Sequence, residues 1–518
     1  MAKEIHSETF RDEGVFFVVL VGVAAFAVSA AMSLLAGMPK PEIHDEFSYL
    51  LAADTFAHGR LSNPTHPMWI HFETLHVNQQ PSYASMYPPG QGLLLALGKI
   101  ATGYSIVGAW LGVALGCAAV CWMLMAWLPP RWALLGGMLV TLHPMVMQWS
   151  QNYWGGGLAM AGGALVLGGF RRVLSQPRSR DAAVLGIGVG ILANSRPYEG
   201  LILSMLVLAT LLVWTFRRSS PGWQVMLRQF FVPAFLTLLP AGIFIGYYNY
   251  RVTGNVLRLP VMVNFATYGQ APPFLWMEAR PQAGYRHAAI EKFHGELAMK
   301  EFRKQRTLIG FVSRAWEKIL GLAKDYFQSW GLIAPLLMIL FKRKIDPWMR
   351  LELALFGSFL LAFLPVTWMQ THYTAPIVPL GFVIVAQGMR DLYQWHWRNL
   401  SLGTWAVNIS LLVCVIAAVL AFRDLSYGDP HHLGWYSKRE QIISHLNKKG
   451  GKHLVVVRYG PEHDPHLEWV YNGADIDGSQ VVWAREMNDA QNLQLVNYFK
   501  DRKVWLFDAD TFALYAVR

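Results

Sequence analysis

Apolar runs of membrane-spanning length recur along almost the whole chain. The hydrocarbon core of a bilayer is about 30 Å thick, and a helix of roughly 20 apolar residues crosses it. Of the 518 residues, 54% are hydrophobic and only 15% are charged, whereas about 25% charged is usual in a soluble domain. The sequence therefore excludes an ordinary soluble protein and predicts a polytopic α-helical membrane protein.

We expect about eleven transmembrane helices within residues 1–425. The first run is too long for the core of a signal peptide, so we expect it to be retained as a helix. Two of the expected spans, 155–170 and 182–192, are short and rich in glycine, which suits helices that pack closely inside a bundle. The expected spans are 15–35, 104–127, 132–147, 155–170, 182–192, 201–216, 230–247, 326–341, 351–369, 374–389 and 405–422.

The basic residues between these runs predict an orientation, because Lys and Arg collect in cytoplasmic loops. With the N-terminus in the cytoplasm, Arg196 is the one notable cation in the short outer loops, and the C-terminus lies outside. The net charge of +11 is then a topology signal, and we expect no nucleic-acid partner. The predicted cytoplasmic cations are Arg131, Arg171, Arg172, Arg178, Arg180, Arg217, Arg218, Arg228, Lys342, Arg343, Lys344, Arg350, Arg390 and Arg398.

Three longer segments, 38–103, 249–324 and 426–518, are left on the outer face. In the last of them, HLVVVRYG and KVWLFDAD read as short buried strands, with a polar helix around 488–499 between them. We therefore expect 426–518 to form a small extracytoplasmic α/β domain. Asp475, Asp477 and His463 in this segment follow no motif spacing.

The first outer segment concentrates acids, histidines and aromatics beside the membrane. Residues 44–60 have helical spacing, with Phe47, Leu51 and Phe56 on one side, which predicts an amphipathic helix along the interface. Asp45 and Glu46 fall in its first turn, where a carboxylate is stabilised by the helix N-terminus. One interpretation is that Asp45 only caps this helix.

A second interpretation comes from a resemblance carried by several motifs in order. These are the acidic pair HDEF after the first span, MYPPGQGLLLALG, YYNYRVTGNVLRLP and HYTAPIVPLGFVI, spread over residues 15–390. Together they resemble the GT-C superfamily of lipid-phosphosugar glycosyltransferases, and most closely the protein O-mannosyltransferase and aminoarabinose (lipid A) transferase type.

The resemblance implies an inverting transferase that moves a sugar, a hexosyl or pentosyl group, from a polyprenyl-phosphate donor to a glycan, lipid or protein acceptor. Asp45 matches the family's catalytic aspartate and is assigned as general base. Glu46 is assigned to orient the acceptor or a metal, and the reverse assignment of these two roles stays open. The active face would be extracytoplasmic, in what is expected to be a bacterial inner membrane.

The phosphate of such a donor needs positive charge or hydrogen-bond donors. Arg196, in NSRPYEG, is the first candidate, with an interfacial snorkelling arginine as the alternative. Arg251, Arg258, Tyr87 and His372 are secondary candidates. Tyr87 stands where some relatives have a Lys that contacts phosphate, and QNYWGG, with Gln151, stands where relatives often have a second acid.

The remaining candidates are polar and aromatic residues expected to line the substrate: His44, Tyr49, Glu73, Tyr83, Asn152, Tyr153 and Trp154. Tyr and Trp also form ordinary interfacial belts, which is the alternative for them. A divalent metal ion is left open as cofactor. His44, His58, His66, His71 and His76, with Glu73, supply the ligand types, but none has HExxH spacing.

Two other functions remain as alternatives. A transporter or lipid flippase would place ionisable residues at mid-membrane depth, whereas this chain gathers them on the outer face. An inactive GT-C-like scaffold stays open for two reasons. The chain lacks the second acid, and it lacks the Glu-Lys pair that some relatives carry directly before the double proline.

Overall fold

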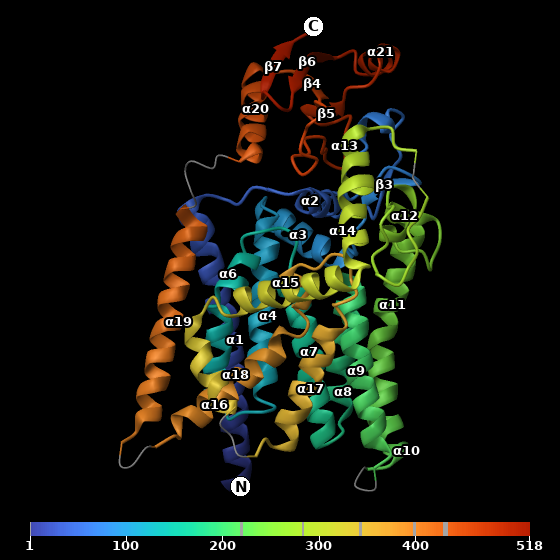
Figure 1. The fold of residues 1–518 in the computed structure, drawn as a ribbon. Coiled ribbons are helices and arrows are strands. Elements are labelled where there is room, and N and C mark those ends of the chain that lie inside the picture. The colour runs from blue at the N-terminus through green and yellow to red at the C-terminus, as the bar shows by residue number, and fades with distance from the viewer. Residues whose placement is uncertain are drawn as a thin grey trace.

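The computed structural model describes residues 2–217, 221–281, 284–340, 344–396, 400–427 and 434–517. It is mostly helical: long helices run side by side in a bundle, and a small sheet unit stands at one end of it (Figure 1). Arg218, Lys342, Arg343 and Arg398, which the topology prediction used, lie outside the described residues.

Six helical stretches are long and apolar enough to cross a membrane, and they correspond to six of the expected spans. They are Asp12–Ala36 of α1 (Ala2–Ala36), α4 (Ile106–Leu124), α7 (Gly157–Ser175), α9 (Pro197–Thr215), Trp223–Thr253 and Leu402–Leu425 of α19 (Leu402–Tyr427). Trp223–Thr253 comprises α10 (Trp223–Met226), a π-helical turn η2 (Leu227–Phe231) and α11 (Val232–Thr253). The chain is an integral membrane protein.

The other five expected spans are shorter helices. They are α5 (Pro130–Thr141) with α6 (Pro144–Trp149), α8 (Ser179–Ser195), α16 (Ile333–Leu340), α17 (Pro347–Leu361) and α18 (Val378–Tyr393). A proline explains the break between α5 and α6, because its ring and missing N–H end a helix that arrives from the N-terminal side. The count of eleven spans therefore stays a prediction.

Several helices lie at the end of the bundle nearer the sheet unit, and α15 (Leu308–Tyr326) runs across the bundle (Figure 1). Those at this end are α2 (His44–Ala57), α3 (Pro89–Thr102), α12 (Pro260–Thr267), α13 (Ala288–Glu291), the π-helical turn η3 (Lys292–Leu297) and α14 (Ala298–Gln305). A small antiparallel sheet has the order β1–β3–β2, from Asn63–Pro64, Ser82–Ser85 and Val77–Asn78. Three short 3-10 turns lie between neighbouring elements of the chain. They are η1 (Trp69–Phe72) between β1 and β2, η4 (Trp330–Leu332) before α16, and η5 (Thr371–Thr374) before α18.

The C-terminal unit contains the expected strands and helix. Its sheet has the order β5–β4–β6–β7, with β4 (Lys452–Arg458) parallel to β5 (Val481–Arg485) and β6 (Arg502–Asp508), and β7 (Ala513–Ala516) antiparallel to β6. The central strand β4 is buried on both faces from His453 to Val457, as its continuous Val-rich run predicts. Two helices, α20 (Trp435–Lys449) and α21 (Asp489–Tyr498), complete the unit.

The C-terminal unit packs directly onto α2. Phe47 stacks on Tyr471 with ring centroids 4.4 Å apart, and the ring of Trp435 lies 5.7 Å away. The expected helix over 44–60 is therefore present, but most of its faces are buried. An interfacial amphipathic helix would expose its polar side to water, but the C-terminal unit covers that side of α2.

Candidate active site

Asp45 stands in the first turn of α2 with a partly exposed carboxylate. The hydroxyl of Tyr87 donates a hydrogen bond to it, and Nδ1 of His44 lies 3.0 Å from its other oxygen. Burial would raise the pKa of Asp45, but the His76 and His44 rings and the Tyr87 hydroxyl outweigh it and hold that pKa far below its ordinary value. Asp45 is therefore an ionised carboxylate at neutral pH.

Glu46, and not Asp45, caps the start of α2. One carboxylate oxygen accepts the backbone N–H groups of Glu42 and Ile43, at 2.7 and 3.4 Å, and the other accepts the N–H of Tyr153 at 2.9 Å. Burial raises the pKa of Glu46 to about 7, despite these N–H donors. The side chain thus fixes the start of α2 against the 153–156 turn and leaves Asp45 to face the site.

Two histidines of the first outer segment gather at Asp45. Ligand atoms of His44, Asp45 and His76 all lie within 4.8 Å of one another. His76 has a left-handed backbone (φ 61°), and its carbonyl accepts the Ser48 hydroxyl at 2.6 Å, which fixes the ring near His44. A third imidazole ring, that of His466 in the C-terminal unit, places Nδ1 3.4 Å from Nε2 of His44.

This cluster fits a divalent transition metal, since imidazole nitrogen and carboxylate oxygen are Zn²⁺ ligands. Burial lowers the pKa of His76 to about 4, so its ring is neutral, which is the form that binds metal. His44, Asp45 and His76 would hold the ion. His466 is a further ligand type within reach, and nothing in its sequence context pointed to the site.

A cationic and aromatic group lies close to Asp45. Arg196, between α8 and α9, places its guanidinium 4.7 Å from the ring centre of Tyr373, and its charge also acts on Tyr49 and Tyr87. Tyr49 and Tyr87 stack with centroids 4.3 Å apart. Phenol rings and the carboxylate of Glu199 therefore act on Arg196. An arginine held among these groups suits anion binding more than snorkelling.

His372 completes this group from the loop before α18. It stacks on Trp154 at 5.2 Å, and Trp154 is presented by a turn in which Gly155 and Gly156 have positive φ values of 90° and 131°. Burial and then the charge of Arg196 hold the pKa of His372 well below its ordinary value, so the ring is neutral. Tyr373, which sequence reasoning missed, follows it directly.

Other expected site residues lie away from Asp45. Glu73 is buried and bonds Tyr268, Arg286 and His287 at 2.9, 3.1 and 3.3 Å. The hydroxyl of Tyr83 donates to the Asn472 carbonyl at 2.9 Å, in contact with the C-terminal unit.

The amide of Asn152 bonds its own turn through the Gln148 carbonyl, and the hydroxyl of Tyr153 donates to the Pro39 carbonyl at 2.7 Å. Arg251 and Arg258 are exposed, and Arg251 contacts Tyr247 on the surface of α11. The remaining loop histidines serve elsewhere: His58 beside Asp54, His66 on Asp477, and His71 on the Arg485 carbonyl.

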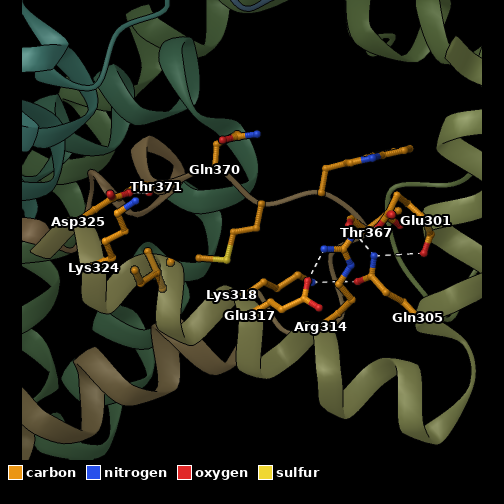
Figure 2. Close-up of a pocket in the computed structure, with 14 residues that line it drawn as sticks. Glu301, Gln305, Arg314, Glu317, Lys318, Lys324, Asp325, Thr367, Gln370 and Thr371 are labelled. Atoms are coloured by element: carbon orange, nitrogen blue, oxygen red, sulfur yellow. Dashed lines mark hydrogen bonds and ion pairs between the residues drawn. The ribbon is translucent and has the colours of Figure 1, made fainter.

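Two cavities adjoin one another around α15. A polar cavity of about 470 Å³ is enclosed by α14, α15 and the 367–371 segment. Figure 2 shows Glu301 and Gln305 beside Arg314, Glu317 and Lys318 at one end, and Lys324, Asp325 and Thr371 at the other. An apolar cavity of about 620 Å³ shares Lys318, Leu322 and Met369 with it and continues between α15, α17 and α18. Gln370 and Thr371, which line the polar cavity, directly precede His372 in the chain.

Scans against models of known protein families and against curated proteins gave no match. Solved structures of similar shape exist. ArnT from Cupriavidus metallidurans, in the apo state and bound to undecaprenyl phosphate, matches with a TM-score of 0.50 and 13% identity. The match covers 96% of this chain and 89% and 90% of those chains.

An oligosaccharyltransferase from Archaeoglobus fulgidus, tethered to an acceptor peptide with the NVT sequon, also matches, with a TM-score of 0.50 and 12% identity over 95% of this chain and 69% of that one. Both kinds of structure belong to the GT-C superfamily. The arrangement of helices, outer segments and C-terminal unit found here is therefore the GT-C fold.

Proposed function

We propose that the protein is an inverting glycosyltransferase that moves a hexosyl or pentosyl group from a polyprenyl phosphate to a glycan, lipid or protein acceptor. The observation that carries the proposal is Asp45, an ionised, partly exposed carboxylate beside the Arg196 group. The solved structures of the same fold support it, because one contains undecaprenyl phosphate and another an acceptor peptide.

The proposed reaction uses few groups. Asp45 takes the proton of the acceptor nucleophile while its oxygen or nitrogen bonds to the anomeric carbon on the face opposite the phosphate. The bond between the anomeric carbon and the phosphate oxygen breaks, and its electron pair leaves with polyprenyl phosphate. Arg196 stabilises the negative charge of that phosphate. Glu46 acts through the backbone as a positioning residue.

The apolar cavity between α15, α17 and α18 suits the first units of the polyprenyl chain. Its walls include Leu322, Phe356 and Leu360, and it adjoins the polar cavity lined by Gln370 and Thr371. In this proposal, residues 1–425, with the outer segments 38–103 and 249–324, hold the donor, and 426–518 cover the acceptor side. The proposed location is a bacterial inner membrane, with the site on the extracytoplasmic face.

A divalent cation at His44, Asp45 and His76 is part of the proposal as a cofactor. When bound, it would supply positive charge beside the transferred group. Asp45 would then serve as a ligand, and removing the cation would lower activity without removing the carboxylate.

The test is transfer of a labelled sugar from membrane-extracted polyprenyl phosphosugars to envelope acceptors, with the wild-type protein and Asp45→Asn at equal expression. We expect transfer by wild type and a loss of at least 100-fold in the variant, the low end for a general base. Asp501→Asn is the matched control, because Asp501 is exposed and pairs with Lys452 at the surface. Transfer by Asp45→Asn at the wild-type rate would refute the assignment.

The same assay separates the alternatives. A scaffold predicts no transfer by any form of the protein when a donor is demonstrably present. A flippase predicts that labelled lipid crosses the bilayer of proteoliposomes with no product formed. Both outcomes are independent of the Asp45 substitution, so they cannot be confused with a wrong choice of base.

A further inference from the structure

A cavity of about 750 Å³ lies at the end of the bundle away from the sheet unit, between the ends of α7 and α9 and the start of α17. This is the end at which the N-terminus and α10 lie (Figure 1). The cavity is therefore far along the bundle from Asp45 and Arg196, and the proposed reaction does not use it.

The inner part of this cavity is apolar. Leu174 comes from α7, Ala209 and Val213 from α9, and Leu351 from α17. Val213 is 60% exposed, so one side of the cavity opens toward the region that lipid would occupy. Walls of this kind accept hydrocarbon chains, because they offer hydrocarbon contact with little polar area to desolvate.

The rim is cationic and aromatic. Arg217 and Arg350 are exposed, and neither has an ion-pair partner among the described residues. The two acids nearest to Arg350 in the sequence have other partners. Glu352 is buried and accepts the Gln387 amide at 3.2 Å, and Asp346 caps α17, accepting the N–H groups of Trp348 and Met349 at 2.9 and 3.0 Å. Two positive charges are thus left to bind an anion from outside the chain.

Two indole rings line the cavity with the arginines and the aliphatic residues. They are Trp214 and Trp348, and the guanidinium of Arg171 lies 3.7 Å from the centre of the Trp348 ring. Tryptophan favours the headgroup level of a membrane. Along α9 the lining residues change from aliphatic (Ala209, Val213) to Trp214 and then to Arg217 toward the end of the bundle, which is the order of a phospholipid's acyl chains, glycerol region and phosphate.

We propose that this cavity binds an anionic phospholipid of the cytoplasmic leaflet, with its phosphate on Arg217 and Arg350 and its chains between α9 and α17. Basic pockets between transmembrane helices are suited to such headgroups. The lipid would brace α9 against α17, and α9 begins at the residue after Arg196. The proposed lipid site does not depend on transferase activity and rests on the cavity and its charges; the choice of leaflet rests on the predicted orientation that the proposed function also uses.

The test is binding of phosphatidylglycerol to the full-length protein in detergent, measured by native mass spectrometry, with phosphatidylcholine and inorganic phosphate as comparison ligands. We expect selective binding of phosphatidylglycerol. Arg217→Gln with Arg350→Gln should weaken it by about ten-fold or more, at about 1 kcal/mol for each basic residue. Arg178→Gln with Arg228→Gln, which removes two exposed arginines at the same end outside this cavity, should not.

A second variant tests the chain-binding part separately. Ala209→Trp keeps both arginines and fills the cavity, so it should also weaken phosphatidylglycerol binding. Equal binding of phosphatidylcholine, equal loss in the two double-arginine variants, or full binding by Ala209→Trp would each overturn the proposal. Inorganic phosphate that displaces the lipid completely would point to a free-anion site and would overturn it as well.

Discussion

At the scale of single residues, Arg196 and Arg251 offer two different phosphate ligands. Arg196 lies among Tyr49, Tyr87 and Tyr373, close to Asp45, whereas Arg251 is exposed on the surface of α11. We expect Arg196→Gln to raise the donor KM about ten- to a hundred-fold, the equivalent of one charge-assisted hydrogen bond of about 1.5–3 kcal/mol. Arg251→Gln should leave it within two-fold. Steady-state kinetics at varied donor concentration measures both, and the reverse order would place the phosphate near α11.

Metal binding is a second property that belongs to individual side chains. His44, Asp45 and His76 are close enough to share one ion. We expect the purified protein to bind one Co²⁺ with visible absorption bands, and we expect His44→Ala or His76→Ala to abolish them. His58→Ala is the matched control, because His58 is exposed and bonded to Asp54. Bands that survive both cluster variants would show that the ion binds elsewhere.

At the scale of elements, Asp54 joins α2, α3 and the C-terminal unit. Its carboxylate accepts hydrogen bonds from Lys99 and from the backbone N–H of Ala474. Burial would raise its pKa, but these two donors outweigh it and lower that pKa below its ordinary value of 3.8. A depressed folded pKa means that the unfolded state binds more protons, so this contribution is present above 3.8 and is lost as the pH falls through the folded pKa.

The corresponding prediction concerns thermal unfolding of the wild-type protein and Asp54→Asn. At pH 7 the variant should be less stable by about 1–3 kcal/mol, because the amide keeps the shape but loses the charge. The difference in Tm should shrink as the pH falls below 3.8. Asp501→Asn, at an exposed ion pair, should show little difference at any pH. A Tm difference for Asp54→Asn that does not change with pH would contradict the mechanism.

Elements whose formation depends on local pattern could be predicted from the sequence. The strands in HLVVVRYG and KVWLFDAD and the helix after His44 are continuous or periodic apolar runs, and all three are present. The choice between Asp45 and Glu46 as cap could not be predicted, because it depends on the N–H of Tyr153, more than 100 residues away. His466 reaches His44 only because the C-terminal unit packs on α2, and no sequence spacing reports that.

At the scale of the whole molecule, the bundle and the C-terminal unit followed from hydropathy and composition, but the lengths of the inner helices did not. Helices such as α8 and α18 are short for a bilayer, and α18 is buried over most of its length. A helix surrounded by other helices is not required to match the hydrocarbon thickness by itself. Hydropathy therefore finds these segments without fixing how many of them span the membrane.

Orientation is the whole-molecule property that the proposed function most depends on, and the three native cysteines make it testable. Cys117, Cys121 and Cys414 are all buried, so the wild-type protein should react little with a membrane-impermeant maleimide. Lys500→Cys in the C-terminal unit and Arg180→Cys in the first turn of α8 introduce exposed thiols at opposite ends of the bundle. In intact cells whose outer membrane, if present, has been made permeable, we expect Lys500→Cys to be labelled. Arg180→Cys should be labelled only after the inner membrane is opened, since basic loops stay in the cytoplasm. The opposite labelling pattern would place Asp45 on the cytoplasmic side and would exclude transfer on the outer face.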